Sequence, residues 1–317
     1  MAVSKQRVGM APAGAPLTAE APTPLAPAGA LPAVGRKGRS EFVYFAFRNW
    51  KFVFGLCVVL GFLALAIFGP MFTAHKPLDF AGPTDARPSH AYWFGTTSYG
   101  QDVYSQFVYG LRSAFLVGAV GGGIAWLLGS AVGFTAGYRG GLVDEILNMI
   151  TNVVLVIPTF ALLLVIAAYL KVRGVLTEAV FIGITSWPWA ARAIRAQTFS
   201  LVSRDFVDMA RLSARRSMRI IFQEIAPNMS SYLVMMFILL FGGAILIAAT
   251  LDFIGLGPSN TISLGMMMQL SVQNAALQLG LWWWFVPPGL VIMMLVGSLY
   301  VMNVGLDEVF NPRLREL

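Results

Sequence analysis

The chain is 317 residues long; 57% of its residues are hydrophobic and only 12% are charged. Soluble domains carry about 25% charged residues, so this composition excludes an ordinary soluble protein and indicates a membrane protein. The single cysteine, Cys57, excludes a disulfide within the chain and a metal cluster built on cysteine. The net charge of +7 belongs to particular loops, which makes it a topology signal and gives no indication of nucleic-acid binding.

Residues 1–40 are rich in Ala, Pro and Gly and show no hydrophobic periodicity. A continuous helix is prevented by Pro12, Pro16, Pro22, Pro24, Pro27 and Pro32. No apolar core follows the first basic residues, as a secretory signal would require. We expect a disordered cytoplasmic tail here, then a first transmembrane helix with an outer loop (41–110) and a five-helix core (111–317).

Six apolar runs follow the tail, and we expect each to cross the membrane. The expected spans are Phe52–Ala74, Ser113–Tyr138, Ile146–Leu170, Gly174–Ala191, Ile225–Leu251 and Leu281–Asn303. The fourth is the weakest, because Glu178 lies near its start and Pro188 near its end. The predicted fold class is therefore an all-α membrane protein with six transmembrane helices.

The uncharged stretch from Phe253 to Leu306 is far too long for one span of about 20 residues. Its first half is polar and Gly-rich, so we expect a loop with a small helix there. Pro287 and Pro288 lie inside the sixth span and predict a kink or a break.

Between the fourth and fifth spans lies the charged segment, residues 203–227. Seven arginines occur from Arg192 to Arg219, and burying seven charges in a bilayer would cost on the order of 20 kcal/mol. The segment is helix-compatible, with Ser203 expected to cap and Asp205 in the first turn. We expect a helix–turn–helix standing in water between two spans.

The distribution of lysines and arginines predicts the orientation, because cytoplasmic loops carry the excess of these residues. With the N-terminus inside, the outer side receives only Lys76, Arg87, Arg112, Lys171 and Arg173. Every other Lys and Arg then lies inside. We therefore predict a multi-pass plasma (inner) membrane protein with both termini and the charged segment in the cytoplasm.

Glycines recur at four-residue spacing in the second span, which allows another helix to approach closely. Gly129, Gly133 and Gly137 form one such face, and Gly118 and Gly122 precede it. We interpret them as helix-packing positions. His75 and His90 have no acidic partner at ligand spacing, so we expect neither a metal site nor a catalytic or cofactor-binding site in this chain.

The charged segment resembles the cytoplasmic signature of permease subunits of binding-protein-dependent ABC importers of the dipeptide, oligopeptide and nickel family. That signature reads Glu-Ala-Ala, three residues, Gly, and a Pro some thirteen positions on; the corresponding residues here are Asp208, Met209, Ala210, Ala214 and Pro227. The Ala in place of Gly suggests a turn without positive φ, or two helices that are less sharply bent.

Further motifs carry the same resemblance in the same order over residues 41–317. They are Trp187-Pro188, Arg204-Asp205-Phe206-Val207, Gly95-Thr96-Thr97, Gly100-Gln101-Asp102, Phe253-Ile254-Gly255-Leu256-Gly257, Trp282-Trp283-Trp284 with Pro288-Gly289, and Asn311-Pro312-Arg313-Leu314-Arg315. The resemblance implies a type I ABC importer permease with a cytoplasmic coupling helix. It implies an ATPase-coupling segment that includes Arg204, Asp205, Phe206, Asp208, Ala210, Arg211, Ser213, Ala214 and Pro227.

The resemblance also implies the partners. They are a homologous second permease subunit, two ABC ATPase subunits that hold ATP and Mg, and an extracytoplasmic solute-binding protein. This chain has no G-x-x-x-x-G-K-[ST] phosphate loop and would need no cofactor of its own. On this interpretation Phe206, Ala210 and Ser213 share the helix face that enters a cleft on the ATPase.

The solute stays open at this stage: a di- or oligopeptide is expected first, with an oligosaccharide or a nickel complex as the alternative. An ion-coupled secondary transporter would place paired ionisable residues in mid-membrane, but the spans are nearly free of charge, and Glu178 and Asp252 are expected near outer ends. An intramembrane enzyme would need paired carboxylates or an H-E-x-x-H motif, and the sequence pattern indicates neither.

Overall fold

The computed structural model describes residues 47–169, 174–259 and 261–310, and the expected N-terminal tail lies outside them. Secondary structure in these residues is helical apart from one isolated bridge between Thr96 and Asp102. Among the described residues, four helices are long and apolar enough to cross a membrane, or five if one bent pair is a single span. The predicted all-α membrane fold is confirmed, whereas the count of six spans stays a prediction.

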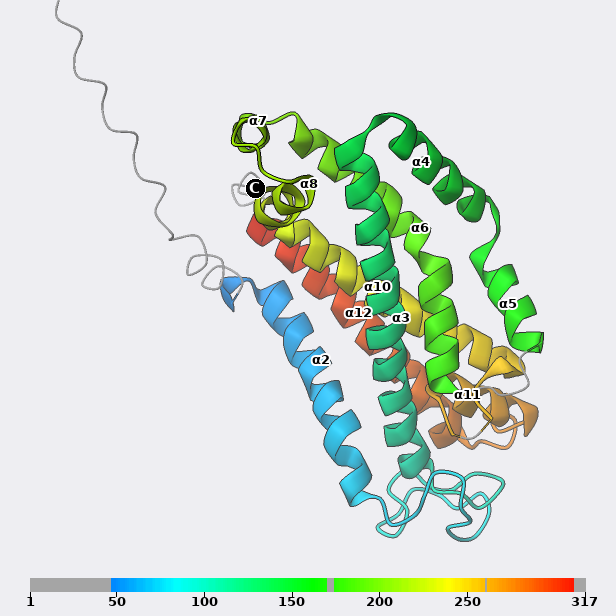
Figure 1. Ribbon diagram of the computed structural model, residues 1–317. Helices are drawn as coiled ribbons and strands as arrows, with labels where there is room; N and C mark the ends of the chain where they lie inside the picture. The colour runs from blue at the N-terminus through cyan, green and yellow to red at the C-terminus, as the bar shows by residue number, and fades with distance from the viewer. Residues whose placement is uncertain (1–46, 170–173, 260, 311–317) are drawn as a thin grey trace, which may run out of the picture. The chain divides into compact units, whose positions relative to one another are not determined.

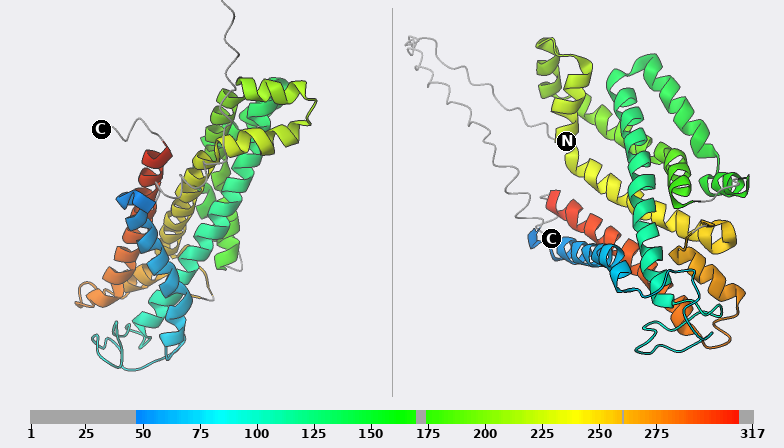
Figure 2. Two further views of the ribbon diagram at one scale, coloured as in Figure 1. Left: turned by 90° about the vertical axis from the view of Figure 1, so that its left-hand side faces the viewer. Right: turned by 60° about the horizontal axis from the view of Figure 1, so that its bottom comes forward.

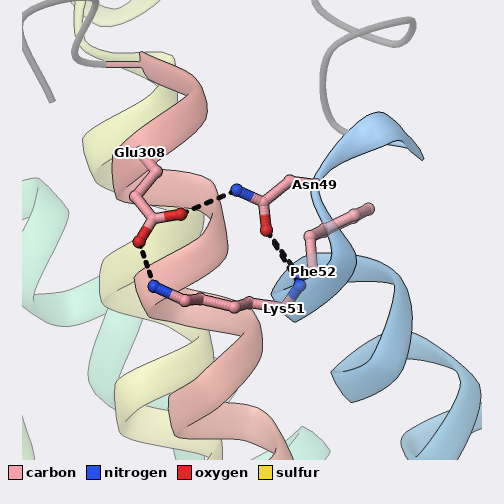
Figure 3. A network of polar contacts seen from close by, with 4 residues as sticks. All are labelled: Asn49, Lys51, Phe52 and Glu308. Atoms are coloured by element: carbon pink, nitrogen blue, oxygen red, sulfur yellow. Dashed lines mark hydrogen bonds and ion pairs between the residues drawn. The ribbon is translucent and has the colours of Figure 1, made fainter. Parts of the chain in front are cut away.

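Helix α2 (Trp50–Phe68) lies beside α12 (Trp282–Phe310), as the views from two sides show (Figures 1 and 2). Asn49 caps α2 by accepting hydrogen bonds from the backbone N–H groups of Lys51 and Phe52 at 3.0 and 3.1 Å. Its side-chain amide donates to Glu308 Oε2 at 2.8 Å, and Lys51 forms an ion pair with the same carboxylate (Figure 3). One asparagine therefore starts α2 and joins it to the last turns of α12.

The longest helix is α3 (Val103–Arg139), which begins ten residues before the expected span. At 1.5 Å per residue its 37 residues extend over about 55 Å. It packs along α6 (Val175–Val202) and α10 (Ser230–Leu251), so these three helices form the centre of the described structure (Figure 1).

The third expected span is not one straight helix. It divides into α4 (Gly141–Val156) and α5 (Thr159–Tyr169), which are bent by 73°. The break is at Ile157 and Pro158. Proline disfavours the helical conformation of the residue before it, and Ile157 is accordingly extended at φ −76° and ψ 121°.

The expected small helix in the long uncharged stretch is α11 (Leu264–Gln273). A π-helical turn, η3 (Asp252–Leu256), joins it to α10. Of the predicted kink or break at Pro287 and Pro288, the break is wrong, because α12 runs through both prolines, and the kink stays a prediction. The prolines are the sixth and seventh residues of α12, so each removes one i→i−4 hydrogen bond, and the helix continues without these two bonds.

Candidate functional site

The charged segment forms a compact structure at the end of α3 that carries Arg139 (Figure 1). It consists of α7 (Asp205–Leu212), a turn, α8 (Ser217–Ile220), the π-helical turn η2 (Ile221–Ile225) and α9 (Ala226–Asn228). The expected helix–turn–helix is therefore present. The expected cap at Ser203 is wrong: Ser203 ends α6, and the N-cap of α7 is Arg204, which makes no side-chain capping bond.

The turn after α7 requires a left-handed residue, and Ala214 occupies that position at φ +48°. The backbone N–H of Ala214 donates to the Arg211 carbonyl at 2.9 Å, and that of Arg215 donates to the Ala210 carbonyl at 3.4 Å. This pair of bonds is a Schellman motif, which usually has Gly at the left-handed position. The expectation of a turn without positive φ is therefore wrong, and the chain accepts strain where Gly would avoid it.

The inner face of the charged segment packs on its own chain. Val207 is 0% exposed and Ala210 6%, and they belong to one apolar cluster with Ile194 of α6, Ile220 and Ile225. Ala210 therefore does not share an exposed face with Ser213, and the expectation that it enters a partner's cleft directly is wrong. Its small side chain lets α7 pack against its own chain.

The outer face of the charged segment is apolar but exposed. It consists of Met209 and Leu212 of α7, which are 67% and 87% exposed; Met218 and Phe222 are also exposed, but they line a cavity against α3. Charged residues lie next to them in α7: Arg211 lies 5.6 Å from the Tyr138 ring centroid and pairs with Asp208 at 3.0 Å. Large apolar side chains that a chain leaves exposed together in a charged surrounding mark an interaction surface. Sequence reasoning missed these residues, although their apolar character inside a charged run was a signal.

The remaining residues of the predicted coupling segment are exposed or half-buried. Asp205 and Asp208 lie in the first turn of α7, where the helix dipole stabilises a negative charge. Phe206 is half-buried against the inner cluster, and Pro227 lies in α9, where its missing N–H costs nothing.

The glycines of α3 lie against α6. A Cβ atom added to Gly129 would lie 2.6 Å from Ala190 Cβ, one on Gly133 would lie 2.8 Å from the Ala191 carbonyl oxygen, and one on Gly137 would lie 2.8 Å from the Arg195 carbonyl oxygen. Real Cβ atoms do not approach so closely, so only Gly fits. Together these positions form the glycine seam, which holds α3 directly on the helix that leads into the charged segment.

The same stretch of α6 is fixed to α4 by polar contacts. The Arg195 guanidinium forms a two-pronged ion pair with Asp144, with Nη2 donating to Oδ2 at 2.5 Å. Arg192 donates to Asn152 at 2.9 Å. Two of the arginines that precede the charged segment therefore have partners within the chain.

At the other end of α3 lies the loop of residues 73–102. Thr96, fully buried, accepts from the Ala86 backbone N–H at 2.8 Å and donates to the Pro83 carbonyl at 2.6 Å. Asp102 caps α3 through the Tyr104 N–H at 3.1 Å; burial raises the pKa of its carboxyl, and the backbone hydrogen bonds partly oppose that rise. The expected motifs around Gly95 and Gly100 thus build a folded loop.

A cavity of about 400 Å³ opens between α3, α5, α6, α10 and α12. Its lining includes Ser186, Trp189, Gly243 and Tyr300 and carries no charged residue. The Ser186 hydroxyl is buried and has no hydrogen-bond partner among the described residues. Sequence reasoning did not identify pathway-lining residues, because the five helices meet here from distant parts of the chain.

The structure also corrects the expectation that no carboxylates are paired. Glu178 in the first turn of α6 and Asp252 at the end of α10 lie close together and line the same small cavity, although 74 positions separate them. In the part of the chain that the structure describes, no group of three or more His, Cys, Asp or Glu residues could hold a metal ion.

The chain matches a known family over residues 129–316, more than half of its length; the family is described as binding-protein-dependent transport system inner membrane component. It is 30% identical to the dipeptide transport system permease protein DppC of Alkalihalophilus pseudofirmus, covering 84% of this chain and 88% of that protein. It is 28% identical to the oligopeptide transport system permease protein OppC of Bacillus subtilis, covering 83% and 85%. It is also 28% identical to DppC of Haemophilus influenzae, covering 87% and 95%.

Proposed function

The chain belongs to the family of inner membrane components of binding-protein-dependent transport systems, and from this we propose that it forms half of the translocation pathway of an ATP-driven peptide importer. A second, homologous permease subunit would form the other half. Di- or oligopeptides are the proposed solutes because the relatives are named as dipeptide and oligopeptide permeases. An extracytoplasmic binding protein would deliver them.

The observation that carries the coupling part of this proposal is the exposed apolar face of the charged segment. Met209 and Leu212 are exposed on a short helix whose inner face is packed on α6 and η2. A movement imposed on these side chains would therefore be passed to the spans through Val207 and Ala210. We propose that each of two ATPase subunits, which hold ATP and Mg, docks a permease at this face.

The uncharged cavity beside α5 supports the pathway part of the proposal. Its polar groups are hydroxyls, such as those of Ser186 and Tyr300, and an indole N–H at Trp189. Such groups hydrogen-bond a polar solute without holding it through charge, which suits a pathway that must release its cargo. The chain itself would act as a transport component and not as an enzyme.

The orientation completes the proposal, with both termini and the charged segment in the cytoplasm. Ser89 and Ser213 are both exposed in the structure, so cysteines at these positions are sterically open to label. In a background with Cys57→Ala, we expect Ser89→Cys to react with an impermeant maleimide on intact cells and Ser213→Cys to react only after lysis. Labelling of Ser213→Cys on intact cells would contradict the orientation.

The outer face of the charged segment is tested by changing a leucine to glutamate at that face and at a control position. Leu212→Glu puts a carboxylate where we propose an apolar contact, so copurification of the ATPase subunits should fall by about tenfold or more. Leu279→Glu is the matched control: Leu279 is 63% exposed and lies between α11 and α12, outside the charged segment. Equal recovery of the ATPase with both variants would overturn the coupling proposal.

A further inference from the structure

The contact between Glu178 and Asp252 is unusual because both groups are acidic and neither has a basic partner among the described residues. Asp252 is 3% exposed, and the Oε1 atom of Glu178 and the Oδ1 atom of Asp252 are both buried. No N–H or O–H group of the described residues donates to either of these two oxygens. The Ser263 hydroxyl reaches the Asp252 carboxyl group and leaves Oδ1 without a donor.

The surroundings of the pair offer no counter-charge. A small cavity of about 20 Å³, room for a single water molecule, lies beside both carboxyls. Its other lining residues are uncharged and come from five helices, α3, α6, α10, α11 and α12, together with Ser263, the N-cap of α11.

The other groups near the pair do not neutralise it. The Ser113 hydroxyl donates to the backbone carbonyl oxygens of Ile262 and Tyr109 at 3.0 and 3.2 Å, so its proton does not reach the carboxyl pair. On its other side Glu178 faces Leu163, Ile166 and Ala167 of α5, which are apolar. Arg112 of α3 is exposed and does not line the cavity; Lys171 and Arg173 lie outside the described residues.

Two carboxylates in contact inside a low-dielectric site cannot both be ionised, because desolvation and mutual repulsion both oppose the charges. One proton placed between them supplies the missing donor to both buried oxygens and removes one charge. Such a pair titrates as a unit, and the proton belongs to neither residue alone.

We infer that Glu178 and Asp252 form a proton-binding site that holds one proton between the two carboxyl groups at neutral pH and fastens the first turn of α6 to the end of α10. When the proton is lost, the like charges repel and this end of α6 is no longer held. The inference concerns the chain itself and stands apart from the proposed transport function.

Infrared spectroscopy of the full-length chain in lipid nanodiscs tests for the proton directly. At pH 7, wild type should show the C=O stretching band of a protonated carboxylic acid, shifted in D₂O, and the variant with both Glu178→Gln and Asp252→Asn should lack it. Asp102→Asn is the control, because Asp102 is a buried carboxyl away from this pair whose pKa burial also raises, and its removal should leave the band in place. A wild-type spectrum that matches that of the double variant would overturn the inference. A band that appears only after a metal chelator is added would also overturn it, because a metal ion would then occupy the place of the proton.

The pH dependence of thermal unfolding gives a second readout. The unfolded chain releases these protons near pH 4, whereas the folded chain retains one of them, so the folded state binds more protons above that pH. The melting temperature of wild type should therefore fall as pH rises above about 4, and the fall should be smaller in Glu178→Gln, whose amide can donate to Asp252. An equal slope in wild type and Glu178→Gln would contradict a shared proton. If the double variant does not fold, this slope and the wild-type D₂O shift still decide the question.

Discussion

The glycine seam and the outer face of the charged segment lie on connected helices but differ in what completes them. The seam is closed within the chain: backbone atoms of α6 fill the space that a side chain on α3 would need. The outer face is open, with Leu212 at 87% and Met209 at 67% exposure. A substitution in the seam should therefore act on folding, whereas one on the outer face should act only where a partner is present.

A large effect on stability is expected in the seam itself. Gly133→Ala would place a Cβ atom 2.8 Å from the Ala191 carbonyl oxygen and 2.9 Å from Ile194 Cβ, so the helices must move apart. We expect a loss of about 1–3 kcal/mol of stability, measured as a lower melting temperature in detergent. Gly123→Ala is the control on the same helix, because nothing lies within 4 Å of its added Cβ. Equal losses from both variants would show that α3 and α6 do not pack as described.

Substitutions on the two faces of α7 should likewise differ in their effect on stability. Ala210→Glu buries a carboxylate in the cluster with Ile194 and Ile225, so the melting temperature of the isolated chain should fall. Leu212→Glu should leave that temperature unchanged. An isolated chain that tolerates Ala210→Glu as well as Leu212→Glu would show that the inner face of α7 is not packed.

A smaller effect of opposite sign is expected at the turn. Ala214→Gly removes the left-handed strain at φ +48° and should stabilise the chain by about 1 kcal/mol. The same change at Ala131, an exposed position inside α3, should instead destabilise by roughly 1 kcal/mol. Thermal unfolding of both variants measures the two signs, and destabilisation by Ala214→Gly would contradict the turn geometry.

The smallest effect concerns the junction of α2 and α12. The Lys51 and Glu308 side chains are 33% and 29% exposed, so Glu308→Gln should cost about 1 kcal/mol or less. Asn49→Ala removes the cap of α2 as well as the bond to Glu308, and should cost more, about 1–2 kcal/mol. A larger loss from Glu308→Gln than from Asn49→Ala would reverse the order described here.

Local patterns predicted much of this structure. The apolar runs placed most of the long helices, and the four-residue glycine spacing indicated a packing face that the structure places against α6. The arginine run identified a segment that is largely exposed to water in the structure. Each of these features depends on residues that are near one another in the sequence, where helical periodicity applies.

The errors have a common physical origin in longer-range packing and in single backbone positions. Pro158 breaks the third apolar run, although the surrounding hydrophobicity is continuous. Ala210 lies on the inner face because α7 packs on its own chain, which helical spacing cannot show. Glu178 and Asp252 meet only because α6 and α10 pack side by side. None of these contacts leaves a periodic trace in one sequence.

The central claim is that the outer face of the charged segment is the docking surface for an ATPase subunit. In a Cys57→Ala background, Leu212→Cys should react rapidly with a maleimide in the isolated chain, and the reaction should slow by about tenfold or more once the ATPase subunits are bound. Ala210→Cys should react slowly in both states, because its side chain is buried within the chain. Equal reactivity of Leu212→Cys with and without the ATPase subunits would contradict the account.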